Sequence, residues 1–80
     1  MLTVRYFAGA RAAAGGVSSE EISAATLSEL ISVLTARHGE RLAVVLKAAS
    51  FLVDGLTSHN PEATLPAEGT VDVLPPFAGG

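Results

Sequence analysis

The chain has 80 residues, which is enough for one small domain and too few for two. It contains no cysteine, so disulfide bonds, thiolate metal sites and a cysteine nucleophile are excluded. Its net charge is −3 and its five basic residues are scattered singly, whereas a nucleic-acid-binding protein usually carries a clustered basic patch. No apolar run approaches the ~20 residues that a membrane span needs, and no signal-peptide pattern precedes the first strand, so we expect a cytoplasmic protein.

The first part of the chain predicts two paired strands with a helical turn between them. Residues 2–7 have a period of two, which predicts a strand with one buried face. Its two faces carry Leu2, Val4 and Tyr6 on one side and Thr3, Arg5 and Phe7 on the other. The alanines of residues 8–16 favour a turn of helix, which the glycines end. Residues 17–22 predict a second strand that pairs with the first, and we interpret Glu20 and Glu21 as the polar side of this edge strand.

The middle of the chain predicts the main helix, over residues 27–38. Thr26 and Glu29 have the spacing of a capping box, and Gly39 supplies a stop. The apolar residues of this segment recur every three or four positions and form one stripe: Leu27, Leu30, Ile31 and Leu34. Residues 40–49 predict a second, short helix.

The last part predicts a hairpin and a final strand. Residues 51–58 form two strands joined at Asp54-Gly55, which is a strong hairpin signal. Residues 71–74 form the final strand, with Val71 and Val73 inward and Asp72 and Leu74 outward. One main helix on one face of a mixed sheet of four to five strands is an α+β arrangement. The element order fits the β-grasp fold, in which the first and last strands are parallel neighbours at the centre of the sheet.

No catalytic or metal-binding constellation is visible. His38 and His59 have no cysteine nearby and lack the i, i+4 spacing of a helix-borne metal motif. We therefore interpret His38 as a helix-end residue and His59 as a solvated loop residue. The chain is not expected to be catalytic by itself or to bind a cofactor.

The end of the sequence indicates a different kind of function. We interpret residues 1–75 as the domain and residues 76–80 as a flexible tail. Two prolines end strand pairing and restrict the backbone, and two glycines can enter a channel too narrow for side chains. The carboxylate of Gly80 is then the least hindered group that the chain offers to a reagent. The alternative is an end that frays and has no chemical role.

The predicted elements and the tail together resemble the ubiquitin-like sulfur carriers of the MoaD/ThiS family, most of all the small subunits of molybdopterin synthase. The likeness covers nearly the whole chain and is carried by VRYFAGAR, TLSELISVL, VDGL and GTVDVLPPFAGG. It implies that an E1-like adenylating and sulfurating enzyme (MoeB type) uses ATP to activate Gly80, which becomes a thiocarboxylate. The tail would then enter the large subunit of molybdopterin synthase (MoaE type) and donate sulfur for molybdenum cofactor biosynthesis.

Strand alternation predicts the surface that docks on these partners. Phe7 and Leu74 point away from the helix on neighbouring strands, and Leu52 points the same way on the next strand. An apolar cluster on a helix-free face is a candidate partner surface, although ordinary scatter of exposed apolar side chains is the alternative. Phe77 is expected to anchor the tail at the mouth of the partner's channel. The other tail residues expected to contact a partner are Pro75, Pro76, Ala78 and Gly79.

Three other functions remain open at this point. The same chemistry could serve thiamine or cysteine biosynthesis, because carriers for those pathways share the fold, the glycines and the thiocarboxylate. The chain could also be a β-grasp binding module whose tail does no chemistry. A protein modifier that forms isopeptide bonds with lysines is the third alternative.

Overall fold

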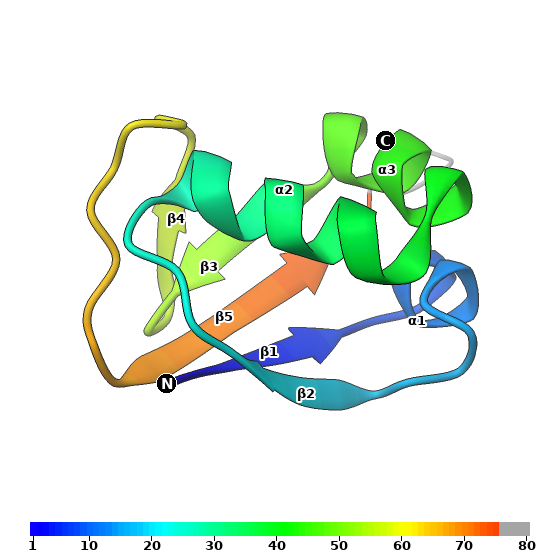
Figure 1. Cartoon of the computed structure of the whole chain (residues 1–80), viewed down its shortest axis with the longest axis horizontal. Helices are drawn as coiled ribbons and strands as arrows, with labels where there is room; N and C mark the ends of the chain where they lie inside the picture. Colours follow the sequence, from blue (N-terminus) through cyan, green and yellow to red (C-terminus); the bar gives the residue numbers. More distant parts are fainter. Residues whose placement is uncertain (76–80) are drawn as a thin grey trace.

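The computed structural model describes residues 1–75, which form a five-stranded mixed sheet with helices on one face (Figure 1). The strands are β1 (Leu2–Tyr6), β2 (Ser19–Ile22), β3 (Ser50–Val53), β4 (Leu56–Ser58) and β5 (Gly69–Leu74). The helices are α1 (Gly9–Ala13), α2 (Leu27–His38) and α3 (Glu40–Ala48). Each predicted strand and helix is therefore present.

The strand order is β2-β1-β5-β3-β4, with β1 and β5 parallel at the centre of the sheet. β2 pairs antiparallel with β1, and β3 pairs antiparallel with both β4 and β5. The β1–β5 register runs from Leu2 opposite Gly69 to Tyr6 opposite Val73, and the Phe7 amide then donates to the Val73 carbonyl at 3.3 Å. The predicted β-grasp fold is confirmed.

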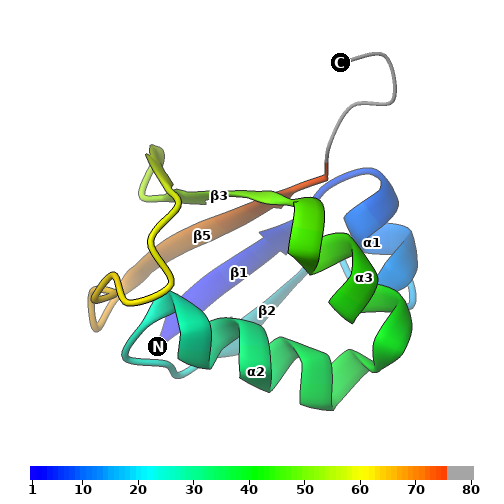
Figure 2. The same cartoon turned by 90° about the horizontal axis from the view of Figure 1, so that it is seen from above.

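The core lies between the sheet and the helices. Figure 2 shows α2 and α3 on the same side of the sheet, and within residues 1–75 no helix covers the opposite side, which we call the helix-free face. Three of the four residues of the predicted α2 stripe are buried, with Leu30 and Leu34 fully inaccessible, while Ile31 is partly buried. Leu42 of α3 joins this core. On the sheet the fully buried core residues include Val4, Val71 and Val73.

The ends of α2 follow from local sequence. The Thr26 hydroxyl accepts a hydrogen bond from the Glu29 amide at 3.2 Å, as a capping box requires. The Glu29 carboxylate accepts from the Ala25 amide at 3.2 Å, one residue earlier than the standard box. Gly39, with φ of 88°, separates α2 from α3. None of the helices within residues 1–75 has the length and apolar character that crossing a bilayer requires.

The turn of the β3–β4 hairpin is hydrogen-bonded to the start of β5. Asp54 and Gly55 have φ of 49° and 85°, as expected of a two-residue hairpin loop. The Asp54 amide donates to the Thr70 carbonyl at 2.8 Å, and the Asp54 carboxylate accepts from the Thr70 amide at 2.9 Å. The two hydrogen bonds of Asp54 thus offset the energetic cost of its positive φ, and they place β5 beside β3.

Candidate functional site

The predicted reactive tail follows directly from β5. This strand has a partner on both sides, with Ser50 of β3 opposite Leu74 and β1 along its other edge. The position of Leu74 is therefore fixed by its neighbours in the sheet, and Pro75 follows it as the last residue that the structure describes. The predicted site residues that lie outside the described part of the chain are Pro76, Phe77, Ala78, Gly79 and Gly80.

The three apolar residues predicted for docking share the helix-free face. Leu52 lies opposite Asp72 in the β3–β5 register, and Leu74 follows two residues later on the same side of β5. Arg5 also lies opposite Asp72, and its guanidinium carbon is 5.7 Å from the centroid of the Phe7 ring. Phe7, Leu52 and Leu74 are all half-buried. Their contribution to partner binding stays a prediction.

An ion pair that the sequence analysis did not foresee occupies the centre of this face. Arg5 Nε donates to Asp72 Oδ1 at 2.6 Å, and Arg5 Nη2 donates to Asp72 Oδ2 at 2.8 Å. The Asp72 side chain faces outward as predicted, but only 12% of it is exposed, against 51% for Arg5. The hydrogen bond to Asp72, together with its charge, raises the pKa of Arg5 above its ordinary value. Strand alternation put both residues on this face, but no sequence signal gives the parallel register that pairs them.

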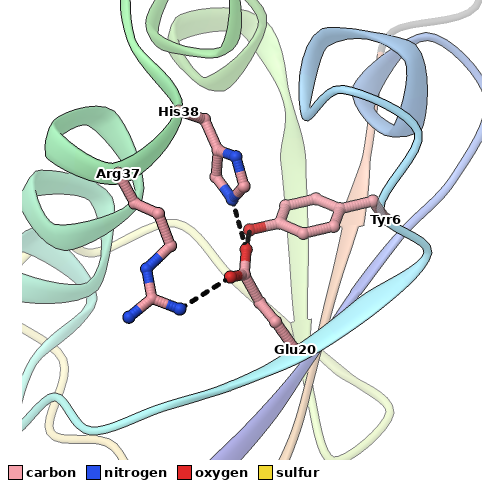
Figure 3. A network of polar contacts seen from close by, with 4 residues as sticks. All are labelled: Tyr6, Glu20, Arg37 and His38. Carbon is pink, nitrogen blue, oxygen red and sulfur yellow. Dashed lines mark hydrogen bonds and ion pairs between the residues drawn. The ribbon is translucent and has the colours of Figure 1, made fainter.

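A second polar cluster lies on the core side of the sheet, where β2 meets the end of α2 (Figure 3). Glu20 lies opposite Val4 and so faces the core, which means that its assignment to the polar side of β2 is wrong. Its carboxylate accepts a hydrogen bond from the Tyr6 hydroxyl at 2.5 Å and one from Arg37 Nη1 at 2.9 Å. His38 Nε2 lies 2.5 Å from the same carboxylate, so the predicted helix-end histidine also ties two elements together.

The electrostatics of this cluster favour an ionised Glu20. Burial opposes ionisation, but the hydrogen bonds from Tyr6, His38 and Arg37 outweigh it and hold the pKa of Glu20 below its ordinary value. Burial, and then the bond to Glu20, raise the pKa of Tyr6 well above its ordinary value. The polar groups of this cluster are hydrogen-bond partners of one another, so we interpret the cluster as a structural link between β1, β2 and α2. Within residues 1–75, no three acidic, histidine or cysteine side chains gather as metal ligands.

A groove of about 590 Å³ opens between α2, α3 and the segment that follows β4. Its walls include Leu27, Ile31 and Phe51, with Lys47 and His59 as the basic residues. None of the described residues that we predict to contact a partner lines it. The groove therefore does not belong to the predicted sulfur-transfer surface.

Comparison with known proteins assigns the chain to a family. The sequence profile of the ThiS family matches residues 4–80. One chain of the Amycolatopsis orientalis BexX/CysO complex superposes with a TM-score of 0.80 at 27% identity, over 100% of both chains. A putative molybdopterin converting factor subunit 1 from Pyrococcus furiosus gives a TM-score of 0.76 at 26% identity, over 95% of this chain and 97% of that one.

A third solved structure shows the same fold in a complex. One chain of the Helicobacter pylori complex of molybdopterin-converting factor subunits 1 and 2 gives a TM-score of 0.74 at 24% identity, over 99% of this chain and 97% of that one. No curated protein matches the chain. Structures named CysO and molybdopterin converting factor are similar to this chain to nearly the same degree, so the comparisons support the family and not one branch of it. With a profile match from residue 4 to Gly80 and a β-grasp sheet, the chain belongs to the ThiS family of ubiquitin-like sulfur carriers.

Proposed function

We propose that this sulfur carrier is the small subunit of molybdopterin synthase and that Gly80 is its reactive residue. The observation that carries the proposal is the family match through Gly80, at the end of a sequence that leaves the central strand through Pro75-Pro76-Phe77. That proline-proline-aromatic sequence favours the molybdopterin branch. The similarity to a putative molybdopterin converting factor subunit at 26% identity supports the same choice.

The proposed chemistry needs no catalytic side chain on this protein. A carboxylate is a poor electrophile, so a Gly80 oxygen first attacks the α-phosphate of ATP on an E1-like adenylating enzyme and pyrophosphate leaves. A sulfur nucleophile from a donor then forms a bond to the Gly80 carbonyl carbon as AMP departs. The thiocarboxylate sulfur is a soft nucleophile, and in the large subunit it forms a bond to a carbon of the pterin precursor. Water then cleaves the bond between this sulfur and the Gly80 carbonyl carbon, which restores the carboxylate, and a second charged carrier supplies the other sulfur of the dithiolene. Because activation consumes ATP, we propose a cytoplasmic location.

A second candidate has the same chemistry and a different acceptor. The similarity to a chain of the BexX/CysO complex at 27% identity favours a carrier for a pathway other than molybdenum cofactor synthesis, such as cysteine or thiamine biosynthesis. The two candidates differ in the protein that accepts sulfur. Incubating the thiocarboxylated protein with the large subunit of molybdopterin synthase and the pterin precursor separates them, because dithiolene forms only if the first candidate is correct.

The decisive experiment measures intact mass after incubation with ATP, the cognate adenylating enzyme and a sulfur source. We expect one oxygen to be replaced by one sulfur in the wild-type protein. Deletion of Gly80, or Gly79→Trp, should abolish this change while the melting temperature stays nearly the same, because the sheet and the core are already built from residues 1–75. An unchanged wild-type mass with an enzyme of verified activity would mean that the tail does no chemistry and that the domain is only a binding module.

A further inference from the structure

We propose that Arg5 is a recognition residue of the carrier, which donates hydrogen bonds from its free guanidinium edge to an oxygen acceptor on the adenylating enzyme. This inference rests on the proposed function, because it concerns the enzyme that activates Gly80. It adds a polar contact to a docking surface that the sequence analysis described only by its apolar residues. The acceptor is a carboxylate or a carbonyl oxygen of the enzyme.

The geometry of Arg5 leaves part of its guanidinium group available. A guanidinium carries five N–H donors, and Asp72 receives bonds from Nε and Nη2. Within the described part of the chain, Nη1 donates to no protein group, and half of the Arg5 side chain is exposed. Asp72 on one side and the Phe7 ring on the other hold the group in one orientation. A fixed planar donor is well suited to recognise an oxygen acceptor.

The surroundings of Arg5 require that a docking partner supply that acceptor. Arg5 is the one basic residue among the five strands that the structure describes. Arg5, Asp72 and Leu52 form one row across β1, β5 and β3, and the Phe7 ring lies 5.7 Å from the Arg5 guanidinium carbon. A partner that covers the apolar residues of this face therefore also removes water from Arg5. Asp72 already pairs the charge, but the Nη1 donors that Asp72 does not reach would lose their water, and leaving them unpaired would weaken binding. An arginine that is fully paired at an interface centre often contributes much of the affinity.

The length of the tail limits where the adenylating enzyme can bind the domain. Five residues, 76–80, separate Pro75 from the carboxylate that reacts in the proposed function. A chain of five residues spans at most ~18 Å, while the longest dimension of the protein is 31 Å. An enzyme that holds Gly80 in its active site must therefore approach the domain near the end of β5, which is where Phe7 and Leu74 lie beside Arg5.

Two variants remove the cation in different ways. Arg5→Gln alone leaves the Asp72 carboxylate buried without its counter-ion, so it is expected to destabilise the fold. The double variant Arg5→Gln/Asp72→Asn removes both charges and keeps groups that can hydrogen bond to each other. Arg41→Gln is the matched control, because it makes the same change at an exposed residue of α3, in the helix layer on the other side of the sheet.

The experiment measures ATP–pyrophosphate exchange by the cognate adenylating enzyme as a function of carrier concentration. For the double variant we expect KM for the carrier to rise about tenfold, equivalent to ~1.4 kcal/mol, with kcat unchanged because the chemistry at Gly80 is untouched. Arg5→Lys, which keeps the charge without the planar group, should fall between the double variant and the wild type. Arg41→Gln should match the wild type.

The outcomes separate the inference from the function on which it rests. No exchange with the wild-type protein contradicts the proposed function. Exchange with the wild-type protein, together with equal KM values for the double variant and Arg41→Gln, contradicts the role of Arg5 alone. Repeating the assay at high salt identifies the acceptor. A carboxylate predicts a steeper salt dependence for the wild type than for the double variant, and a carbonyl predicts equal slopes.

Discussion

Ala8 has a backbone conformation that its sequence does not predict. It stands between β1 and α1, with φ of 49° and ψ of −123°, in a region of backbone space that glycine enters far more easily. Strain of this kind costs on the order of 1–3 kcal/mol and persists only where the surrounding structure imposes it. Here the Phe7 amide donates to the Val73 carbonyl of β5, and the amides in the first turn of α1 donate to the Phe7 and Ala8 carbonyls. The strained residue thus adjoins the proposed docking surface.

Replacing Ala8 with glycine should stabilise the protein. The free energy gained by relieving this strain exceeds the free-energy cost of the extra conformational entropy that glycine loses on folding. We therefore expect Ala8→Gly to raise the free energy of unfolding by about 1 kcal/mol. Ala8 is exposed, so the lost methyl group leaves no cavity. Ala12→Gly is the control at an exposed position inside α1, where glycine should lower stability by ~1 kcal/mol. Urea denaturation of both variants checks the prediction, which is wrong if the two lose stability equally.

Among the helices and strands, the sequence predicts those whose signals lie close together in the chain. α2 has a cap, an apolar stripe and a stop within 14 residues, and the β3–β4 hairpin is marked by Asp54-Gly55. The position of Glu20 was missed because three of the four residues of β2 are polar, so the apolar alternation that shows the buried face is weak. Opposite Val4, Glu20 faces inward and reaches His38, which lies 18 residues away in the sequence. No local pattern links the two residues.

The Glu20 cluster should make the attachment of β2 to α2 depend on pH. The pKa of Glu20 is lower in the folded protein than its ordinary value of 4.5, so in acid the unfolded chain binds the proton more readily. The stability that Glu20 contributes is therefore present above pH ~4.5 and lost as pH falls below it. Glu20→Gln should lose ~2 kcal/mol of stability at pH 7, and its difference from the wild type should shrink as pH falls below 4.5.

Glu21 provides the control for this pH dependence. It is exposed on the helix-free face of the same strand, where its carboxylate accepts a hydrogen bond from the Thr3 hydroxyl at 3.1 Å. Glu21→Gln should leave the pH profile nearly unchanged, because an exposed bond of this kind contributes little. Urea denaturation at a series of pH values from 3 to 7 measures both variants. A Glu20→Gln profile parallel to that of the wild type would exclude Glu20 as the titrating group.

In the molecule as a whole, the two faces of the sheet have different roles. The helix side holds the core, and the other side carries Phe7, Leu52 and Leu74 around the Arg5–Asp72 pair. Strand alternation was enough to assign the apolar residues to the second face, because alternation is a property of each strand alone. The Arg5–Asp72 ion pair could not be predicted from alternation, because it depends on the register between β1 and β5, which is set only in the folded sheet. Stability and partner binding should therefore respond to different substitutions.

Leu74→Glu tests this separation directly. Leu74 is half-buried at the end of β5, on the face that carries no core, so a carboxylate there can remain in contact with water in the free protein. Against an apolar partner surface the same carboxylate would be buried and unpaired, which should weaken binding at least tenfold. Calorimetric titration into the large subunit of molybdopterin synthase measures the affinity. We expect the melting temperature to fall by less than about 5 °C.

Val44→Glu is the matched substitution on the opposite layer. Val44 is 58% exposed on α3, so replacing it also exchanges an accessible apolar side chain for a carboxylate. Because α3 covers the core side of the sheet, this variant should keep both its melting temperature and its affinity. If Leu74→Glu and Val44→Glu bound the large subunit equally well, the helix-free face could not be the surface that docks, and the tail would have to enter its partner from another side of the domain.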